Sequence, residues 1–425
     1  MKRILVISWF YPPINSSEGL VTFKLLNNSR YEYDVYTQKG ATDFSYGKNV
    51  ALENHQNVRS IWANSRTIPK WKEEAVEFFR EHHDEYDCVM TRSMPQESHE
   101  VGAAIKKEFP GVYWIASFGD PIKANPYQHI DCSLHSYHGM DNLINRGKGL
   151  KFRLSPSRMF YSGYWRIKHR FEVRFRKQLA KIEDDALSLC DCVIYNNESQ
   201  QKYMSTSDEI LKKSVVIPHS YDSSFYPERD PEPHDKIKFL FVGHLDAIRT
   251  IYPLFEAVKD LKDSDKNLAD RVQFDFYGDM SDGDLLYWVK NDLGDVIKLH
   301  HNVPYLESLK LMRNADWNIH VDGNIRLVSD ENIFFAAKVA DYFGSGTPIL
   351  AYTMNAGATY EYLKNAGEMV LSYSAMEIRQ NLFYILYKGL TVDQNRDYIS
   401  KFDAVNVAKK FDDEVVGRFL EIKGK

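Results

Sequence analysis

An arginine close to a glycine is the first feature of this sequence that could carry chemistry. Arg249 follows the apolar run IKFLFV and the pair Gly243-His244, and it stands just before a helical stretch. The free N–H groups and the dipole of a helix start attract anions, and a guanidinium can donate two parallel hydrogen bonds to a phosphate. Gly243, His244 and Arg249 therefore predict a pyrophosphate site. The alternative is a solvated arginine at an ordinary helix start.

A lysine and an aspartate form the second feature. Apolar residues at helical spacing predict a helix over 331–343, stopped by Gly344 and Gly346 before a short apolar strand. Lys338 and Asp341 stand three positions apart, so they are expected to share one face near the end of that helix. The lysine could hold a phosphate, and the carboxylate could hold the hydroxyls of a ribose. The competing interpretation is a surface ion pair without a function.

Two further candidates lie in the N-terminal half, each after a predicted strand. Gly19 ends the loop that follows the first strand and stands where a helix should begin, so this loop could receive a substrate, although an ordinary turn explains it equally well. Asp120 follows the strand VYWIA and precedes a proline. Its carboxylate could act as a base or hold a hydroxyl group, and the alternative is a helix N-cap.

Signatures of metal and cofactor sites are weak or missing. The segment 129–138, HIDCSLHSYH, has two histidines at a spacing that suits zinc, but no second ligand pair accompanies them, so no metal is predicted. No G-x-G-x-x-G follows a predicted strand, and neither G-x-x-x-x-G-K-[ST] nor G-x-S-x-G occurs. We therefore expect no nicotinamide cofactor, no P-loop and no nucleophile elbow.

The stretch 146–177 is strongly basic and rich in aromatic residues, with Glu172 as its one acid. This composition fits the surface of an anionic membrane, and it also fits nucleic acid. A net charge of −5 argues against nucleic acid as a partner, so we favour a membrane surface. The remaining alternative is the solvated face of a long helix.

Bulk composition is that of a globular protein of 425 residues, enough for two domains. Four cysteines are too few for a disulfide framework in so long a chain, and no run of about 18 apolar residues exists. The basic, apolar start MKRILVIS is interpreted as a first strand rather than a signal peptide. A reducing, cytoplasmic setting is expected.

Predicted strands alternate with predicted helices, which favours parallel sheets covered by helices on both faces. A proline-rich, charged linker at 227–235 separates two such series, so we predict an N-terminal domain over 1–226 and a C-terminal domain over 227–403. The helical stretch 404–425 could pack back on the N-terminal domain. Ligands bind such sheets beyond the carboxyl ends of their strands, so a cleft between two facing domains would collect all the candidates above.

Several segments resemble the GT-B glycosyltransferases, in particular the large retaining group called family 4. ILVISWFYPPINSSEG is similar to the family's first strand and its YPP-x-x-GG loop, where the acceptor approaches, with Gly19 remaining of the paired glycines. IPHSYDSSFYP resembles the domain-linking IPNGVD-x-x-F-x-P, with His219 at the asparagine position and Asp222 kept. Asp120, before its proline, resembles a D-P that some members carry near the acceptor.

The predicted pyrophosphate site carries the same resemblance. FVGHLDAIRT is similar to the family's VGRL-x-x-x-KG, whose residues hold the pyrophosphate of the donor. Gly243 matches, His244 stands at the arginine position, and Arg249 stands at the lysine position. The resemblance thus implies that these three residues bind the donor.

The last segment, KVADYFGSGTPILAY, resembles the family's E-A-x-A-x-G-x-P-V-I-A, with Asp341 at the glutamate that commonly holds the donor's ribose. Members whose helix reads K-x-x-x-Y-x-x-x-G-x-P imply a donor contact for Lys338. The family's other glutamate lies eight positions earlier and falls on Ile333 here. Glu331, or the neighbouring Asp330, is the candidate to replace it.

The resemblance implies an α/β protein of GT-B architecture, with two doubly wound Rossmann-like domains facing a central cleft. It further implies a retaining, metal-independent hexosyltransferase that moves a sugar from a UDP- or GDP-linked donor on the C-terminal domain to an acceptor on the N-terminal domain. Asp120, Arg249 and Lys338 are the catalytic candidates, because the two cations could neutralise the leaving nucleoside diphosphate in place of a metal.

The basic stretch 146–177 extends this hypothesis to the membrane. It suggests a lipid-linked acceptor in cell-surface polysaccharide synthesis, and a peripheral protein on the inner face of the plasma membrane. Two alternatives stay open: a nucleotide-sugar epimerase, and a non-catalytic sugar-binding or scaffold protein of the same fold.

Overall fold

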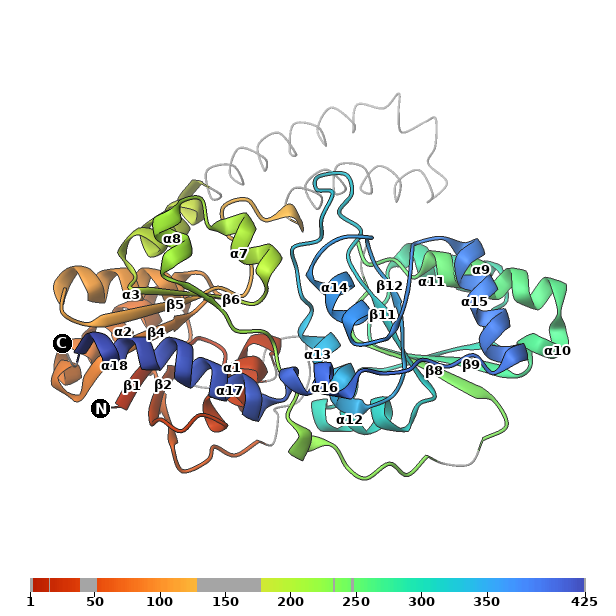
Figure 1. Ribbon diagram of the computed structural model, residues 1–425, viewed down its shortest axis with the longest axis horizontal. Helices are drawn as coiled ribbons and strands as arrows, with labels where there is room; N and C mark the ends of the chain where they lie inside the picture. Colours follow the sequence, from red (N-terminus) through yellow and green to blue (C-terminus); the bar gives the residue numbers. More distant parts are fainter. Residues whose placement is uncertain are drawn as a thin grey trace.

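The structure, a computed structural model of the whole chain, describes residues 3–14, 16–38, 52–127, 177–231, 234–245 and 248–423. Two α/β lobes lie side by side, and both chain termini lie on the N-terminal lobe (Figure 1). The histidine-rich segment 129–138 and the basic stretch, apart from Lys177, fall outside the described residues. None of the helices in the described ranges is long and apolar enough to cross a membrane.

The N-terminal lobe contains a sheet of seven strands, in the order β3-β2-β1-β4-β5-β6-β7. All of its pairings are parallel. The strands are β1 (Arg3–Ile7), β2 (Tyr33–Thr37), β3 (Val58–Trp62), β4 (Tyr86–Arg92), β5 (Tyr113–Ser117), β6 (Cys192–Tyr195) and β7 (Ser214–Val216). The helices described in this lobe are α1 (Ser17–Asn27), α2 (Ile68–His82), α3 (Glu97–Glu108), α7 (Glu198–Met204) and α8 (Asp208–Lys212).

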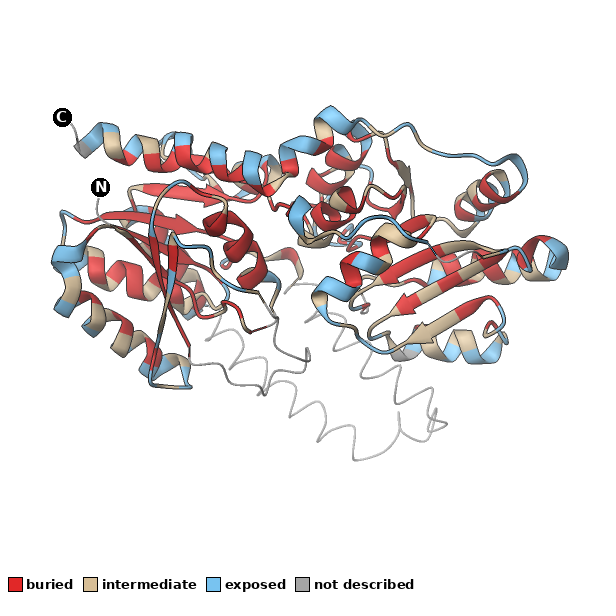
Figure 2. Cartoon of the chain, turned by 90° about the horizontal axis from the view of Figure 1, so that it is seen from below, coloured by how far each residue is buried: buried red, intermediate tan, exposed pale blue. Residues whose placement is uncertain are grey.

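Alternation along β1 explains why this sheet is covered on both faces. Ile4 and Val6 pack in one buried cluster with α1, whereas Leu5 and Ile7 pack in another with α2 and α3. Successive side chains of a strand point to opposite faces, so an uninterrupted apolar strand needs helices on both sides. Figure 2 shows the buried strands between half-exposed helices.

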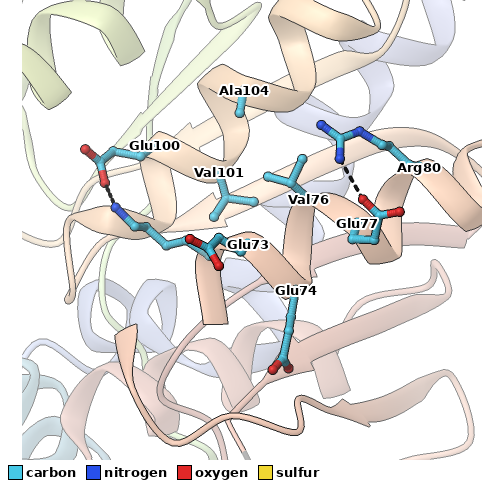
Figure 3. A pocket seen from close by; sticks show the side chains of 9 residues that line it. Glu73, Glu74, Val76, Glu77, Arg80, Glu100, Val101 and Ala104 are labelled. Atoms are coloured by element: carbon cyan, nitrogen blue, oxygen red, sulfur yellow. Dashed lines mark hydrogen bonds and ion pairs between the residues drawn. The ribbon is translucent and has the colours of Figure 1, made fainter. Parts of the chain in front are cut away.

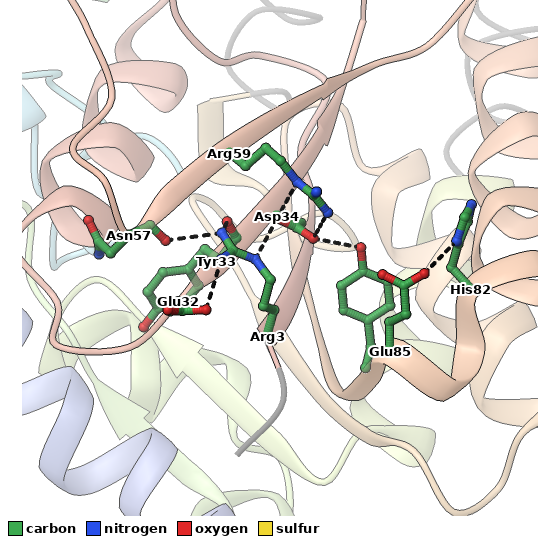
Figure 4. A network of polar contacts seen from close by, with 9 residues as sticks. Arg3, Glu32, Tyr33, Asp34, Asn57, Arg59, His82 and Glu85 are labelled. Carbon is green, nitrogen blue, oxygen red and sulfur yellow. Dashed lines mark hydrogen bonds and ion pairs between the residues drawn. The ribbon is translucent and has the colours of Figure 1, made fainter.

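A charged network ties β3, β2, β1 and β4 of this sheet together (Figure 4). Asp34 on β2 is fully buried, and Arg3 Nε and Arg59 Nη2 donate to its carboxylate at 2.7 and 2.6 Å. The hydroxyl of Tyr86 on β4 also donates to it at 2.8 Å. Burial alone would raise the pKa of Asp34, but hydrogen bonds from Arg59, Tyr86 and Arg3 outweigh this and lower it. The network joins four neighbouring strands, and none of its members lines the pocket between the lobes.

The C-terminal lobe contains a parallel sheet of six strands, in the order β10-β9-β8-β11-β12-β13. The strands are β8 (Ile237–Val242), β9 (Val272–Tyr277), β10 (Ile297–His300), β11 (Trp317–Val321), β12 (Ile349–Tyr352) and β13 (Met369–Leu371). The helices are α9 (Tyr252–Ser264), α10 (Lys266–Ala269), α11 (Asp282–Lys290), α12 (Tyr305–Asn314), α13 (Ala337–Ser345), α14 (Ala358–Asn365), α15 (Ala375–Lys388) and α16 (Arg396–Ile399). Successive side chains of β8 again enter two buried clusters on opposite faces of the sheet. Phe239 and Phe241 pack with α9 and α15, while Leu240 packs with α12 and α13.

The helix predicted over 331–343 is wrong at its start, because α13 begins only at Ala337. The residues just before it are not helical, and Asn332 forms an isolated bridge with Gly357. Ile333 and Phe334 are buried in a small separate cluster, so their apolar character marks core packing rather than a helical face. The helix ends at Gly346, which caps it with φ +70°, and Gly344 lies inside its last turn.

The end of the chain returns to the N-terminal lobe. A bridge between Tyr221 and Asp403 brings the two domain crossings together, and α17 (Ala404–Phe411), a π-helical turn (Asp412–Val416) and α18 (Gly417–Lys423) follow. Apolar side chains of these helices, among them Phe411 and Phe419, belong to the same buried cluster as β1 and α1. The last helices run along the N-terminal lobe, as Figures 1 and 2 show.

Candidate active site between the two domains

A pocket of about 280 Å³ lies between the two lobes and receives residues from both. It is lined by Ser17, Glu18, Val21, Gly119, Asp120, Tyr127, His219, Phe241, His244, Arg249, His320, Val321, Asp322, Phe334, Phe335, Ala336, Ala337 and Lys338. Most of these residues follow the carboxyl ends of strands or begin a helix. This is where parallel α/β sheets bind ligands.

Lys338 and Gly243 define the cationic wall of the pocket. Lys338 is in the first turn of α13, and its Nζ lies 4.6 Å from the centroid of the Phe241 ring. Gly243, just after β8, has φ +135°, and a Cβ at this position would collide with Lys338 Nζ. Glycine is therefore needed here both for its backbone conformation and for the close approach of the ammonium group.

Arg249 lies near Lys338 in the same pocket. Its guanidinium carbon lies 5.4 Å from the centroid of the Tyr127 ring, which comes from the N-terminal lobe. The pKa of Lys338 is lowered to about 7, chiefly by burial and also by the positive charge of Arg249, while Asp341 opposes the shift. Two cations held this closely in a desolvated site favour an anionic ligand.

His244, the third predicted residue of this site, lines the pocket from its exposed rim. Its Nδ1 lies 3.8 Å from a carboxylate oxygen of Asp279. The structure thus brings Lys338 together with Gly243, His244 and Arg249, although Lys338 follows Gly243 by almost a hundred residues in the sequence.

Two carboxylates from the N-terminal lobe form the opposite wall. Asp120 follows β5, and burial raises its pKa to about 7, with the charge of Glu18 adding to the shift and that of Arg249 opposing it. Glu18, in the first turn of α1, accepts a hydrogen bond of 2.8 Å from Nη2 of the buried Arg92. Burial raises the pKa of Glu18, and Arg92 counteracts this. Asp120 therefore changes protonation near neutral pH, next to a Glu18 that is paired with Arg92.

Gly19, the other predicted acceptor residue, does not line the pocket, although its neighbour Glu18 does. It lies in α1, and a Cβ there would approach the backbone of Phe10 and Tyr11 at 3.3 Å. Its lack of a side chain lets the helix pack against the preceding loop, and this places Glu18 on the pocket wall.

Asp341 does not line the pocket either. Its carboxylate accepts hydrogen bonds from Lys24 Nζ at 3.0 Å and from the Tyr305 hydroxyl at 2.9 Å. The Lys24 and Asp341 side chains are 2% and 11% exposed, so this is a buried ion pair between the two lobes. The expected shared face with Lys338 is not formed, since Lys338 points toward Gly243 and Asp341 points toward Lys24.

Glu331, the candidate replacement for the missing glutamate, lies outside the pocket lining. It accepts a hydrogen bond from the hydroxyl of Ser199 on α7. The neighbouring Asp330 is exposed. At the position of the missing glutamate, Ile333 is buried among apolar side chains.

Sequence reasoning did not single out several polar residues of the pocket, among them His219, His320 and Asp322. His320 and Asp322 lie at the carboxyl end of β11, and both are buried. His219, in the domain crossing, stacks on Phe335 with ring centroids 5.7 Å apart. Burial lowers the pKa of both histidines to about 3, so each is neutral at physiological pH.

A usable signal for two of these residues was present in the sequence. Asn318, His320 and Asp322 alternate with apolar residues in WNIHVD, and all three are buried. Polar residues at every second position of a strand share one face. A buried strand with a polar face is a signature of a binding site at its end, which a search for motifs alone does not reveal.

Other hollows have a simpler explanation. A groove of about 610 Å³ lies between α2 and α3, and its charged side chains pair with one another, Lys72 with Glu100 and Arg80 with Glu77 (Figure 3). These pairs are largely exposed, and exposed ion pairs contribute little. Among the described residues, no three His, Cys, Asp or Glu side chains lie close enough together to hold a metal ion.

No protein-family model and no curated protein sequence matches this chain. Solved structures do. Sucrose-phosphate synthase from Thermosynechococcus elongatus superimposes with a TM-score of 0.66 at 14% identity, covering 99% of this chain and 100% of that one. Anabaena HepE in complex with UDP-glucose gives 0.63 at 13%, covering 98% and 100%.

WaaG, described as a glycosyltransferase involved in lipopolysaccharide biosynthesis, gives a TM-score of 0.58 at 13% identity, covering 97% of this chain and 100% of that one. At such identities a structural likeness shows the fold alone. The chain has the GT-B fold, with two parallel sheets flanked by helices, so the predicted fold class is confirmed.

Proposed function

We propose that this chain is a glycosyltransferase that moves a sugar from a nucleotide-sugar donor to an acceptor. The observation that carries the proposal is the meeting of Lys338 and Arg249 beside Gly243 at the end of β8, in a pocket that Asp120 closes from the other lobe. Cations at the end of a strand in one domain, facing a carboxylate of a second domain, suit a reaction between two bound molecules. HepE, of the same fold, was solved with UDP-glucose.

The donor would bind on the C-terminal domain, residues 227–403. The diphosphate would lie against Lys338 and Arg249, with His244 at the rim and Gly243 allowing its backbone to approach. When the bond from the sugar to the diphosphate breaks, negative charge grows on the leaving phosphate. Two fixed cations in a desolvated pocket would stabilise that charge without a metal ion.

The acceptor would bind on the N-terminal domain, residues 1–226. Asp120 faces the cationic wall, and its pKa of about 7 suits a group that takes a proton from an acceptor hydroxyl. Glu18 and the helix start at Gly19 would complete that side. Transfer of a hexose with retention of configuration is proposed from the family resemblance.

A lipid-linked acceptor in cell-surface polysaccharide synthesis is the finer part of the proposal. Its support is the basic, aromatic composition of 146–177 and the fold shared with WaaG. We expect the protein to co-sediment with vesicles that contain anionic lipid, and charge reversal at Arg174 and Arg176 to weaken this. Equal co-sedimentation of the wild type and the charge-reversed variant would contradict the proposed binding to an anionic membrane.

The donor site is tested by ligand binding. In a thermal-shift panel of UDP, GDP and their sugar conjugates, the ligands that carry one of the two bases should raise the melting temperature of the wild-type protein. A ligand that binds the folded state stabilises it. Arg249→Ala should lose that shift. Unchanged binding by this variant would contradict the proposal, and a changed sugar nucleotide formed without any acceptor would favour an epimerase.

A further inference from the structure

Asp322 is the one carboxylate that the described part of the C-terminal lobe contributes to the pocket lining. It directly follows β11, and its N–H donates to Tyr352 O on the neighbouring strand β12 at 2.9 Å. The other two lining carboxylates, Glu18 and Asp120, belong to the N-terminal lobe. Asp322 therefore lies on the same side of the pocket as Arg249 and Lys338, the cations proposed to hold the diphosphate.

The carboxylate of Asp322 is held in one orientation. The N–H of Gly323 donates to Oδ1 at 3.0 Å, and the side-chain amide of Asn332 donates to Oδ2 at 2.7 Å. Asn332 is itself fixed, because its Oδ1 accepts from the Phe334 N–H at 3.1 Å and its backbone pairs with the strand-like segment at Gly357. A Cβ at Gly357 would collide with the backbone oxygen of Asn332. The close approach that orients Asn332, and through it Asp322, thus depends on a glycine.

Hydrogen-bonding capacity remains at this end of the pocket. An ionised carboxylate accepts about four hydrogen bonds, and the described residues supply Asp322 with two. His320 Nε2 lies 4.0 Å from Asp322 Oδ1, and it has no hydrogen-bond partner among the described residues. His320 is buried and neutral, and burial also raises the pKa of Asp322 to about 7, a shift that Arg249 opposes. A neutral ligand group with several hydroxyls would satisfy both side chains.

The carboxylates near Asp322 in the sequence do not line the pocket. Glu331 is hydrogen-bonded to Ser199 and lies outside the lining, and Asp330 is exposed. Only Asp322, among the carboxylates that the structure describes in this lobe, combines a place in the pocket with open acceptor positions beside Arg249.

We propose that Asp322 recognises the glycosyl group of the donor by accepting hydrogen bonds from its hydroxyls, and that Asn332 positions it. This inference rests on the proposed function and adds a specificity-determining residue to it. The glycosyl group would lie between Asp322 and the carboxylates of the N-terminal lobe, while the diphosphate stays on Lys338 and Arg249. Asp322 would then favour binding of the sugar and contribute nothing favourable to binding of the nucleotide.

The test compares, for each variant of the full chain, the dissociation constants of a nucleotide sugar and of its parent nucleoside diphosphate by calorimetry. The probes are UDP-glucose, UDP-galactose and GDP-mannose, each against UDP or GDP. The ratio compared is the dissociation constant of the nucleotide divided by that of the nucleotide sugar, so it falls when the sugar contributes less to binding. In Asp322→Asn, this ratio should fall at least about tenfold for the preferred donor, which corresponds to the loss of one hydrogen bond to a charged group. Binding of the parent nucleotide should not weaken, because the substitution removes a negative charge beside Arg249.

Glu331→Gln is the matched control, because it makes the same carboxylate-to-amide change nine positions away and outside the lining. It should leave the ratio unchanged. Asp322→Glu keeps the charge but moves the carboxylate by one methylene, so it should also lower the ratio and serves if Asp322→Asn does not fold. Asn332→Ser should lower the ratio in part, whereas a purely structural role would change only the melting temperature.

The outcomes separate the inference from the function on which it rests. Nucleotide binding by the wild type, together with an unchanged ratio in both Asp322 variants, overturns the role of Asp322 alone. A ratio that falls in Glu331→Gln instead transfers the role to Glu331 and equally overturns the inference. Absence of any nucleotide binding by the wild type removes the proposed function, and Asp322 loses its role with it.

Discussion

At the scale of single residues, the geometry of the pocket depends on the close contact between Gly243 and Lys338. Gly243 has φ +135°, and any Cβ there would displace Lys338 Nζ. We expect Gly243→Ala to weaken nucleotide binding at least about tenfold, because both the strained backbone and the displaced ammonium group disturb the site. Calorimetry with the preferred nucleotide measures this.

Gly389→Ala is the control for strain alone. Gly389 also has a positive φ, +63°, but apart from its chain neighbours no atom of the described residues lies within 4 Å of the position its Cβ would take. This variant should lower the melting temperature and leave the nucleotide affinity unchanged. Equal losses of affinity in both variants would mean that the contact with Lys338 is irrelevant to binding.

The pH dependence of transfer is a second prediction at this scale. The pKa of Asp120 is raised to about 7, and that of Lys338 is lowered to about 7. As a base, Asp120 must be deprotonated, so the rate should fall as the pH drops below about 7. Lys338 must be protonated to hold a diphosphate, so kcat/KM should also fall above about pH 7. The expected profile is a narrow bell.

Asp120→Asn should abolish most of the activity and remove from the remainder the acid limb that Asp120 contributes. Asp322, whose pKa burial also raises to about 7, stays in the pocket and is common to both proteins. The pair of pKa values read from the wild-type profile belongs to the coupled pocket rather than to either residue alone. An unchanged acid limb in Asp120→Asn would exclude Asp120 as the base.

At the scale of elements, the N-terminal sheet offers a test of stability apart from function. Asp34→Ala should lower the free energy of unfolding by about 2 kcal/mol, because it leaves Arg3 and Tyr86 without their buried partner. The loss is smaller than for a fully buried pair, since Arg59 is more than half exposed and screened by solvent. Urea unfolding measures it, and nucleotide affinity should not change.

The sign of its pH dependence follows from the lowered pKa of Asp34. The network stabilises the fold above the unfolded-state pKa, for which 3.8 is the reference value, and this contribution is lost as the pH falls through the lower pKa of the folded state. Glu77→Ala, which breaks the exposed pair with Arg80, is the control and should have no measurable effect. Equal effects of the two substitutions would refute the distinction between buried and surface charge.

Strands and helices with uniform apolar patterns were predictable from the sequence, and partly exposed or irregular segments were not. Strand β3 was not predicted from the sequence, because it lies at the sheet edge and only Val58 in it is buried. The start of α13 was misplaced because Ile333 and Phe334 are apolar for a different reason, the small cluster they form with Met354. The spacing of apolar residues indicates which residues are buried, not which of them are helical. Buried residues in a non-helical segment just before a helix can therefore be mistaken for the first turns of that helix.

The candidate site was predictable where chemistry accompanied a turn, as at Gly243, Arg249 and Asp120. It was not predictable where a side chain is recruited by tertiary packing. Arg92 reaches Glu18 across the sheet, and Lys24 reaches Asp341 across the domain boundary over 317 residues of sequence. Spacing along the chain contains no information about such contacts.

At the scale of the whole molecule, the two lobes are joined by buried polar contacts as well as by the two chain crossings. Lys24 of α1 pairs with Asp341 of α13, and Asn197 donates to the backbone oxygen of Ile333 at 3.0 Å. The Tyr362 hydroxyl, on α14, donates to Glu198 on α7. These contacts set the relative placement of the two walls of the pocket.

Lys24→Met should therefore lower the free energy of unfolding by roughly 3 kcal/mol, because it leaves the Asp341 carboxylate buried without its cation. The double variant Lys24→Met/Asp341→Leu should recover most of this loss, since no unpaired charge remains. Urea unfolding of the single and double variants measures the coupling. Additive losses would show that the pair does not bridge the lobes in solution.

The central claim is that a nucleoside diphosphate binds between the lobes at the end of β8, and a crystal structure with UDP or GDP, whichever the thermal-shift panel selects, tests it most directly. We expect the two phosphates to contact Lys338 and Arg249, with the backbone at Gly243 close to them. A diphosphate bound elsewhere, or a pocket that stays closed to it at saturating nucleotide, would contradict the account.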